Sequence, residues 1–245
     1  MARNGRGFTK SITSEGIDAR PAAEQGVRMT ITTLSRTHIS NGCLTEYDAF
    51  TDLLEGLTEE QWDAPTRCDG WQARDVAGHV VGLAEDTAAG APGSRTPDEE
   101  AASVRHETPA GAAARLRAAL ASIRAFIDVI DDDAWAGPSG VPDLTLGDGV
   151  LTLWYDTYVH GDDIRDAIGE APQRGASLDA AICYLARQLT TRGWGPATLA
   201  LDDTGRYDIG AGGPAITGDA HEFMLVATGR ADASAMGLEP GVSIY

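Results

Sequence analysis

Two histidines and one aspartate are the residues of this chain best suited to hold a metal ion. Asp156 and His160 are four residues apart, so on a helix their side chains leave the same face. His79 falls between Val76 and Leu83 in the apolar stripe of another helical segment. Neutral imidazoles and a carboxylate suit zinc or another first-row divalent cation, and three protein ligands leave coordination positions open. We therefore predict a metal site between two neighbouring helices.

The same three residues also admit a plainer interpretation. An Asp-x-x-x-His pair on a helix is common as a solvated or hydrogen-bonded pair, and a single inward histidine is often a hydrogen-bonded core residue. The residue pattern alone leaves both interpretations open. The remaining histidines lack such a context and are assigned no function: His38, His106 and His221.

Other catalytic motifs are missing or incomplete. The only lysine is Lys10, in a polar N-terminal stretch, which excludes a buried Schiff-base lysine or a phosphate-binding P-loop. A glycine-rich run at 210–215 resembles the dinucleotide fingerprint, but a proline intrudes and too little chain follows for a βαβ unit. The three cysteines are odd in number and far apart, which predicts reduced thiols: Cys43, Cys68 and Cys183.

Helical periodicity supplies the elements that must position the candidate ligands. Apolar residues recur at spacings of three and four in five segments, at about 34–57, 72–89, 109–130, 150–168 and 178–189, the last with Ser177 as a possible cap. The third of these begins at a Thr-Pro pair, a strong helix start. Between them we expect a polar loop at 90–107 and a turn region at 131–149, both bordering the pocket mouth.

The character of the sequence changes after Gly193. Two stretches at 197–201 and 206–209 flank a turn and predict a hairpin, followed by a short strand near 215–216 and a short helix at 219–228. We therefore predict a mainly α protein, a bundle of four or five helices with a small α+β appendage. The expected organisation is a disordered leader at 1–28, the bundle at 29–192 and the appendage at 193–245.

Charge and composition limit the partners. With 37 acidic and 19 basic side chains the net charge is −18, which argues against a nucleic-acid partner. No stretch approaches the roughly 20 apolar residues that cross a bilayer, and the N-terminus lacks the apolar core of a signal peptide. We expect a cytoplasmic protein, a monomer or homodimer, that acts on small molecules and has no membrane partner.

Several stretches together resemble the maleylpyruvate isomerase family of mycothiol-dependent, DinB-like proteins. The resemblance spans about 34–232 and lies in residues 57–62, 65–71 and 74–79, in a His-x-x-Asp-Ile-Arg-x-Ala-x-Gly signature at 160–169, and in 217–230. It implies a DinB-like four-helix bundle with a divalent metal, usually zinc, held by His79, Asp156 and His160. The family's middle ligand is usually glutamate. Asp156 is one methylene shorter, so a metal-free member is an alternative.

The resemblance also implies an activity. It points to a metal- and mycothiol-dependent isomerase or thiol transferase, in which the metal presents a thiolate to an electrophilic small-molecule substrate. Arg230 resembles a family arginine that contacts a carboxylate of the substrate or cofactor. Asp163 would either orient His160 by accepting a hydrogen bond or pair with Arg165. Two alternatives stay open: a metal-dependent hydrolase or lyase without mycothiol, and a metal-free bundle that acts as a binding module.

Overall fold

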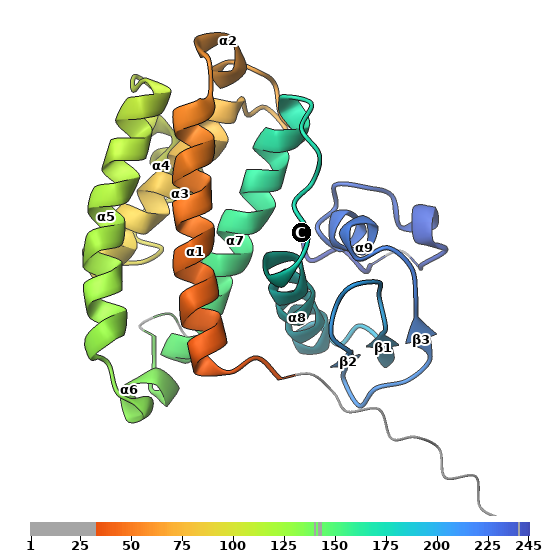
Figure 1. Cartoon of the computed structure of the whole chain (residues 1–245). Helices are drawn as coiled ribbons and strands as arrows, with labels where there is room; N and C mark the ends of the chain where they lie inside the picture. Colours follow the sequence, from red (N-terminus) through yellow and green to blue (C-terminus); the bar gives the residue numbers. More distant parts are fainter. Residues whose placement is uncertain (1–32, 140, 142–143, 240) are drawn as a thin grey trace, which may run out of the picture.

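Four long helices lie side by side in the computed structural model, which describes residues 33–139, 141, 144–239 and 241–245 (Figure 1). The predicted leader at 1–28 lies outside these residues. The four helices are α1 (Arg36–Gly56), α3 (Ala73–Ala88), α5 (Pro109–Val129) and α7 (Leu146–Ala167), and α8 (Ala176–Thr191) packs against α7 and α1. The predicted mainly α bundle with up to five helices is confirmed.

The stretch predicted as a polar loop at 90–107 contains a helix, so that prediction is wrong. This helix, α4 (Pro97–Val104), packs along α3. It begins with a capping box, in which the Thr96 side chain accepts from the backbone N–H of Glu99 and the Glu99 side chain accepts from that of Thr96. Proline at the first helical position adds a preset φ. The polar, acidic composition hid a start signal of the kind that correctly placed α5.

The turn region predicted at 131–149 also differs. It contains α6 (Asp132–Ala136) and the first turn of α7, which begins at Leu146 because Thr145 and Asp148 form another capping box. The expectation that this region borders the pocket mouth is wrong. Among its described residues, none lines the cavity above the candidate metal ligands, and several line a separate apolar cavity.

Core packing fixes the helices at close range. The predicted apolar stripes are buried, as in the fully buried Val76 of α3 and Leu116 of α5. The ring of Trp154 on α7 packs directly on Gly42 of α1, where an added Cβ would lie 2.0 Å from the ring. Glycine there allows close helix contact. The indole N–H of Trp154 donates to the hydroxyl of Ser177 at 2.9 Å, so this serine is not the predicted cap of α8, which Gly175 provides.

The C-terminal elements pack against α8. The predicted hairpin is present as β1 (Ala197–Leu199) antiparallel to β2 (Tyr207–Ile209), and β3 (Ala215–Ile216) runs parallel to β1 in the order β2-β1-β3. Beyond the sheet come α9 (Ala220–Ala227) and a 3₁₀ turn at Ala233–Met236 (Figure 1). A domain boundary at residue 193 stays a prediction. Among the described helices, none combines the length and apolarity that crossing a membrane requires.

Candidate metal centre

The neighbouring helices α3 and α7 bring the three predicted ligands together. His79 of α3 places Nε2 3.4 Å from Oδ2 of Asp156, and His160 places Nε2 3.7 Å from Oδ1 of the same carboxylate. One ligand atom from each of the three residues lies within 4.8 Å of the others. The side chains are 10–16% exposed, so the group faces a cavity from the bundle interior. The structure therefore places the three side chains around one point.

The donor set fits a divalent cation. Oδ2 of Asp156 is buried and has no hydrogen-bond partner, although such atoms are normally satisfied. Ligand atoms on a tetrahedral zinc, at bonds of about 2.0–2.1 Å, lie about 3.3–3.4 Å from one another. The 3.4 and 3.7 Å separations are close to that spacing and long for hydrogen bonds. Aspartate in place of the usual glutamate still brings one ligand atom of each of the three residues within 4.8 Å of the others.

Two further carboxylates turn both imidazoles toward Asp156. Nδ1 of His79 lies 2.6 Å from Oε2 of Glu100, and Nδ1 of His160 lies 3.0 Å from Oδ2 of Asp163. A carboxylate accepts from the Nδ1–H, which leaves the Nε2 lone pair free to bind a metal. Burial lowers the pKa of His79, but Asp156 and Glu100 outweigh this and raise it to about 10. The centre is built to stabilise a positive charge.

Glu100 reaches His79 because α4 lies unusually close to α3. A Cβ on Gly82 would lie 2.6 Å from the Cβ of Glu100, and a Cβ on Gly78 would lie 2.7 Å from the carbonyl oxygen of Ala101. Only glycine permits this approach at both positions. The sequence analysis missed Glu100. The Thr-Pro-x-Glu pattern at 96–99 was the signal that could have placed Glu100 on a helix.

Asp163 holds a buried arginine as well as a candidate ligand. It is fully buried, and Arg230 donates to Oδ1 from Nε at 2.7 Å and to Oδ2 from Nη2. Burial raises the pKa of Asp163, but the hydrogen bonds from Arg230 and His160 hold it far below its usual range. Two of the Arg230 nitrogens are thus committed to Asp163, so Arg230 orients His160 indirectly. Arg165, the other partner considered for Asp163, lines a different cavity.

A second cluster, of Cys68, His160 and Asp163, has the residue types of a metal site, but the positive charge of Arg230 lies beside it. Cys68 lies 3.1 Å from Asp163 and 4.0 Å from Nδ1 of His160, the ring nitrogen that faces away from Asp156. The guanidinium of Arg230 also lies 3.7 Å from the sulfur. Burial and Asp163 raise the pKa of Cys68 to about 12, so the group is a neutral thiol. A cation is therefore favoured on the Asp156 side of His160.

A cavity of about 550 Å³ opens over the three ligands. The Trp71 ring lies across it, 5.7 Å from the His79 ring and 6.4 Å from the His160 ring, and its indole N–H donates to Asp98 of α4 at 3.2 Å. The expectation that 90–107 borders the pocket holds for one residue, since Pro97 lines the wall. The other lining residues come from the 67–71 loop and the C-terminal elements: Arg67, Cys68, Asp69, Thr228, Gly229, Arg230 and Tyr245.

The C-terminal elements are tied to α7 beside this cavity. Arg67 contacts Oδ2 of Asp162 at 2.6 Å, and His221 of α9 contacts the same oxygen at 2.9 Å. His221, to which the sequence analysis assigned no function, thus links α9 to Asp162 of α7, the helix that carries Asp156 and His160. Burial raises the pKa of Asp162, but His221 and Arg67 outweigh it and lower the pKa.

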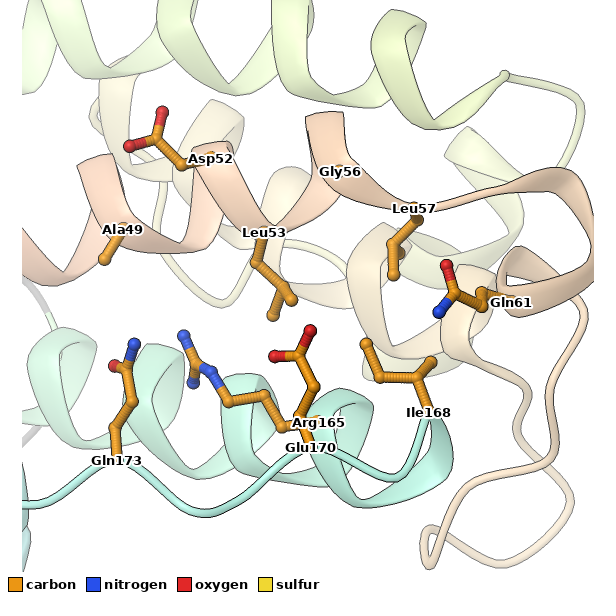
Figure 2. A pocket seen from close by; sticks show the side chains of 10 residues that line it. All are labelled: Ala49, Asp52, Leu53, Gly56, Leu57, Gln61, Arg165, Ile168, Glu170 and Gln173. Carbon is orange, nitrogen blue, oxygen red and sulfur yellow. The ribbon is translucent and has the colours of Figure 1, made fainter.

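A different cavity, of about 390 Å³, lies on the other side of α7 against α1. Figure 2 shows its side chains, among them Arg165, with Asp52 and Glu170 as its acidic residues. Arg165 is buried, and its Nη1 has no hydrogen-bond partner. The buried carboxylate of Glu46 offsets that charge, since Arg165 lowers the pKa of Glu46 against the larger effect of burial. None of the candidate metal ligands reaches this cavity, so it is separate from the metal centre.

Zinc binding is expected to release a proton. In the metal-free centre His79 is protonated at pH 7.5, because its pKa is raised to about 10, and it must lose that proton to ligate zinc. Apparent zinc affinity should therefore rise about tenfold per pH unit between pH 7 and 9. Calorimetry in buffers of different ionisation enthalpy measures the released proton. Glu100→Gln should reduce the release, whereas Glu60→Gln, at an exposed position of the short helix α2 (Glu59–Trp62), should not. A pH-independent affinity would contradict the expectation.

Comparisons with known proteins agree with the fold. The family model described as the mycothiol maleylpyruvate isomerase N-terminal domain matches residues 43–165, half of the chain, and that span contains His79, Asp156 and His160. No curated protein sequence matches the chain.

Two crystal structures resemble the chain, both of the mycothiol-dependent maleylpyruvate isomerase. A point mutant of that enzyme has a TM-score of 0.62 at 15% identity, covering 84% of this chain and 95% of the other. The second structure has a TM-score of 0.58 at 16% identity, covering 81% and 90%. At this identity the likeness establishes the DinB-like fold alone. Because the family model spans half of the sequence, the chain belongs to the mycothiol maleylpyruvate isomerase N-terminal domain family.

Proposed function

We propose that this protein is a metal-dependent enzyme that uses a thiol cosubstrate to isomerise, or transfer the thiol to, an electrophilic small molecule. The carrying observation is the Asp156 carboxylate, whose buried Oδ2 has no hydrogen-bond partner and lies 3.4 Å from Nε2 of His79, while its Oδ1 lies 3.7 Å from Nε2 of His160. Two imidazoles and one carboxylate suit zinc. Membership of the family, and the likeness to structures of a mycothiol-dependent enzyme, support mycothiol as the thiol.

The charge of the centre supports thiol chemistry. When bound, a divalent cation with two neutral imidazoles and one carboxylate supplies a net charge of about +1, which favours the thiolate form of a nearby thiol. The chain's own thiol at the site, Cys68, has a pKa raised to about 12 and is held by Asp163. Without a cation this thiol is a weak nucleophile at neutral pH, which supports an external thiol as the nucleophile.

The surrounding side chains divide the remaining work. Glu100 and Asp163 hold the protons on Nδ1 of the two histidines, and Arg230 fixes Asp163. The remaining nitrogen of Arg230, Nη1, makes only a 3.4 Å contact with a carbonyl oxygen, so it is the guanidinium nitrogen best placed to meet an acidic group in the cavity. Trp71 covers one side of the centre and limits the access of water.

Cobalt substitution tests this proposal. The cobalt-loaded protein should develop a sulfur-to-metal charge-transfer band in the near ultraviolet on titration with mycothiol. S-methylated mycothiol is the matched control and should give no band. If cobalt binds but mycothiol produces no spectral change, thiol chemistry is excluded and the hydrolase or lyase alternative is favoured. If the protein does not retain cobalt at all, the non-catalytic alternative is favoured.

A further inference from the structure

The bundle contains a second interior space that the proposed metal chemistry does not use. A cavity of about 240 Å³ is lined by residues from the end of α5 and the start of α7. Figure 1 shows these two helix ends near α6. All four long helices line it, through residues such as Cys43, Leu83, Ile123 and Leu153. It shares no lining residue with the cavity over the metal ligands.

The lining offers no free polar group from the helices. The hydroxyls of Thr87 and Thr152 each donate at 2.8–2.9 Å to a carbonyl oxygen four residues earlier in their own helix, those of Leu83 and Asp148. None of the residues that line the cavity has a charged side chain. Cys43, at its inner end, is fully buried. An ion would find no charged partner on these helix surfaces, and water would find only hydroxyl lone pairs and the Cys43 thiol.

The size and the opening of the cavity indicate a ligand. Protein interiors are close-packed and hold few voids larger than a water molecule, and an apolar cavity of about 150 Å³ stays dry and binds benzene. A volume of 240 Å³ therefore has room for more than one ring. Phe126, half exposed on α5, and Pro92, after α3, stand at its edge and connect it to the surface.

We propose that this end of the bundle is a binding site for an uncharged apolar molecule about the size of a two-ring aromatic compound. The cavity shares no lining residue with the metal centre, but α3 and α7, which carry the candidate metal ligands, also contribute to its lining. Leu83 lies one turn after His79, and Leu153 lies three residues before Asp156. The bound molecule would pack against the helix pair that carries the metal ligands.

The uncharged two-ring dye 1-aminonaphthalene tests the proposal, because its fluorescence changes in apolar surroundings. The full-length protein should bind it saturably, with one site per chain. Naphthalene should displace the dye, whereas 2-naphthoate, of similar shape but charged, should displace it at least about tenfold more weakly. Equal displacement by both compounds, or a signal that never saturates, would overturn the proposal.

Filling the cavity provides the structural control. Gly149 of α7 lines it, and an added Cβ there meets only the Cβ of Ser139, at an ordinary 3.5 Å. Gly149→Leu should weaken dye binding at least tenfold and raise the melting temperature, whereas Gly149→Ala should change binding by less than threefold. Ile123→Phe fills the space from α5 and should act like Gly149→Leu. Val129→Ser changes an apolar residue that is 79% exposed and lies outside the cavity, so it should leave binding unchanged.

The same variants separate this site from the proposed function. His79→Ala should bind the dye as the wild type does, because His79 does not line the cavity. Full dye binding in both folded filling variants would overturn the site, and it would leave the proposed function untouched.

Discussion

Replacing His79 with alanine is expected to abolish tight metal binding. The variant removes one of the three proposed protein ligands and leaves Asp156 without the nitrogen that lies 3.4 Å from its unpartnered oxygen. Loss of even an outer hydrogen-bonding partner typically costs 10–100-fold in metal affinity, so loss of a ligand should cost at least about 100-fold. Elemental analysis after dialysis against a chelator should find about one zinc per wild-type chain and less than about a tenth in the variant.

An exposed histidine serves as the matched control. His106 lies on the surface after α4, and His106→Ala should retain the full metal content. Zinc should raise the melting temperature of the wild type and of His106→Ala, and it should not raise that of His79→Ala. Equal zinc contents in the wild type and His79→Ala would exclude this centre as the metal site.

Replacing Asp163 with asparagine should give the largest loss of stability. The variant keeps the volume of the side chain but leaves the guanidinium of Arg230, whose side chain is 9% exposed, without its bidentate partner. Removing one partner of a buried ion pair costs about 3–5 kcal/mol. For a chain of this length that corresponds to a melting temperature lower by about 6–20 °C. Thermal unfolding followed by circular dichroism measures the shift, and the exposed Asp128→Asn on α5 should change it little.

The pH dependence of that loss has a definite sign. Because the pKa of Asp163 is far below its usual range in the folded protein, its stabilising contribution is complete above about pH 4 and is lost as the pH falls below that. The difference in the free energy of unfolding between the wild type and Asp163→Asn should therefore become smaller on acidification. A second substitution, Arg230→Met, should recover part of the loss, because it removes the unpaired charge. A difference in unfolding free energy that grows at low pH would contradict this account. So would an Asp163→Asn, Arg230→Met double variant that is less stable than the sum of the two single effects predicts.

Much of the fold followed from periodicity, because apolar spacing and capping residues are local signals. The inward direction of His79, between Val76 and Leu83, followed from the same pattern. The spacing of Asp156 and His160 placed both on one helix face, and the structure brings the three side chains together. Their role as metal ligands stays a prediction that the zinc measurements test.

What the sequence could not reveal depends on packing between distant elements. The contact of Glu100 with His79 joins residues 21 apart, on two helices whose spacing no local pattern specifies. The hydrogen bonds from Arg230 to Asp163 span 67 residues and leave Nη1 as the guanidinium nitrogen that can meet an acidic group in the cavity. Cys68 looked like an isolated thiol because its neighbours come from α7 and from the C-terminal elements.

The two glycines of α3 impose a conflict on any effort to make the protein more heat-resistant. Gly78 and Gly82 lie inside a helix, where alanine would ordinarily be preferred by about 1 kcal/mol at each position. A search for thermostable variants that scores helix formers favourably would select those replacements first. An alanine Cβ at either position would push α4 away from α3 and would move the Glu100 carboxylate away from His79. The two glycines therefore lower the intrinsic stability of α3, and they allow Glu100 to orient the His79 imidazole.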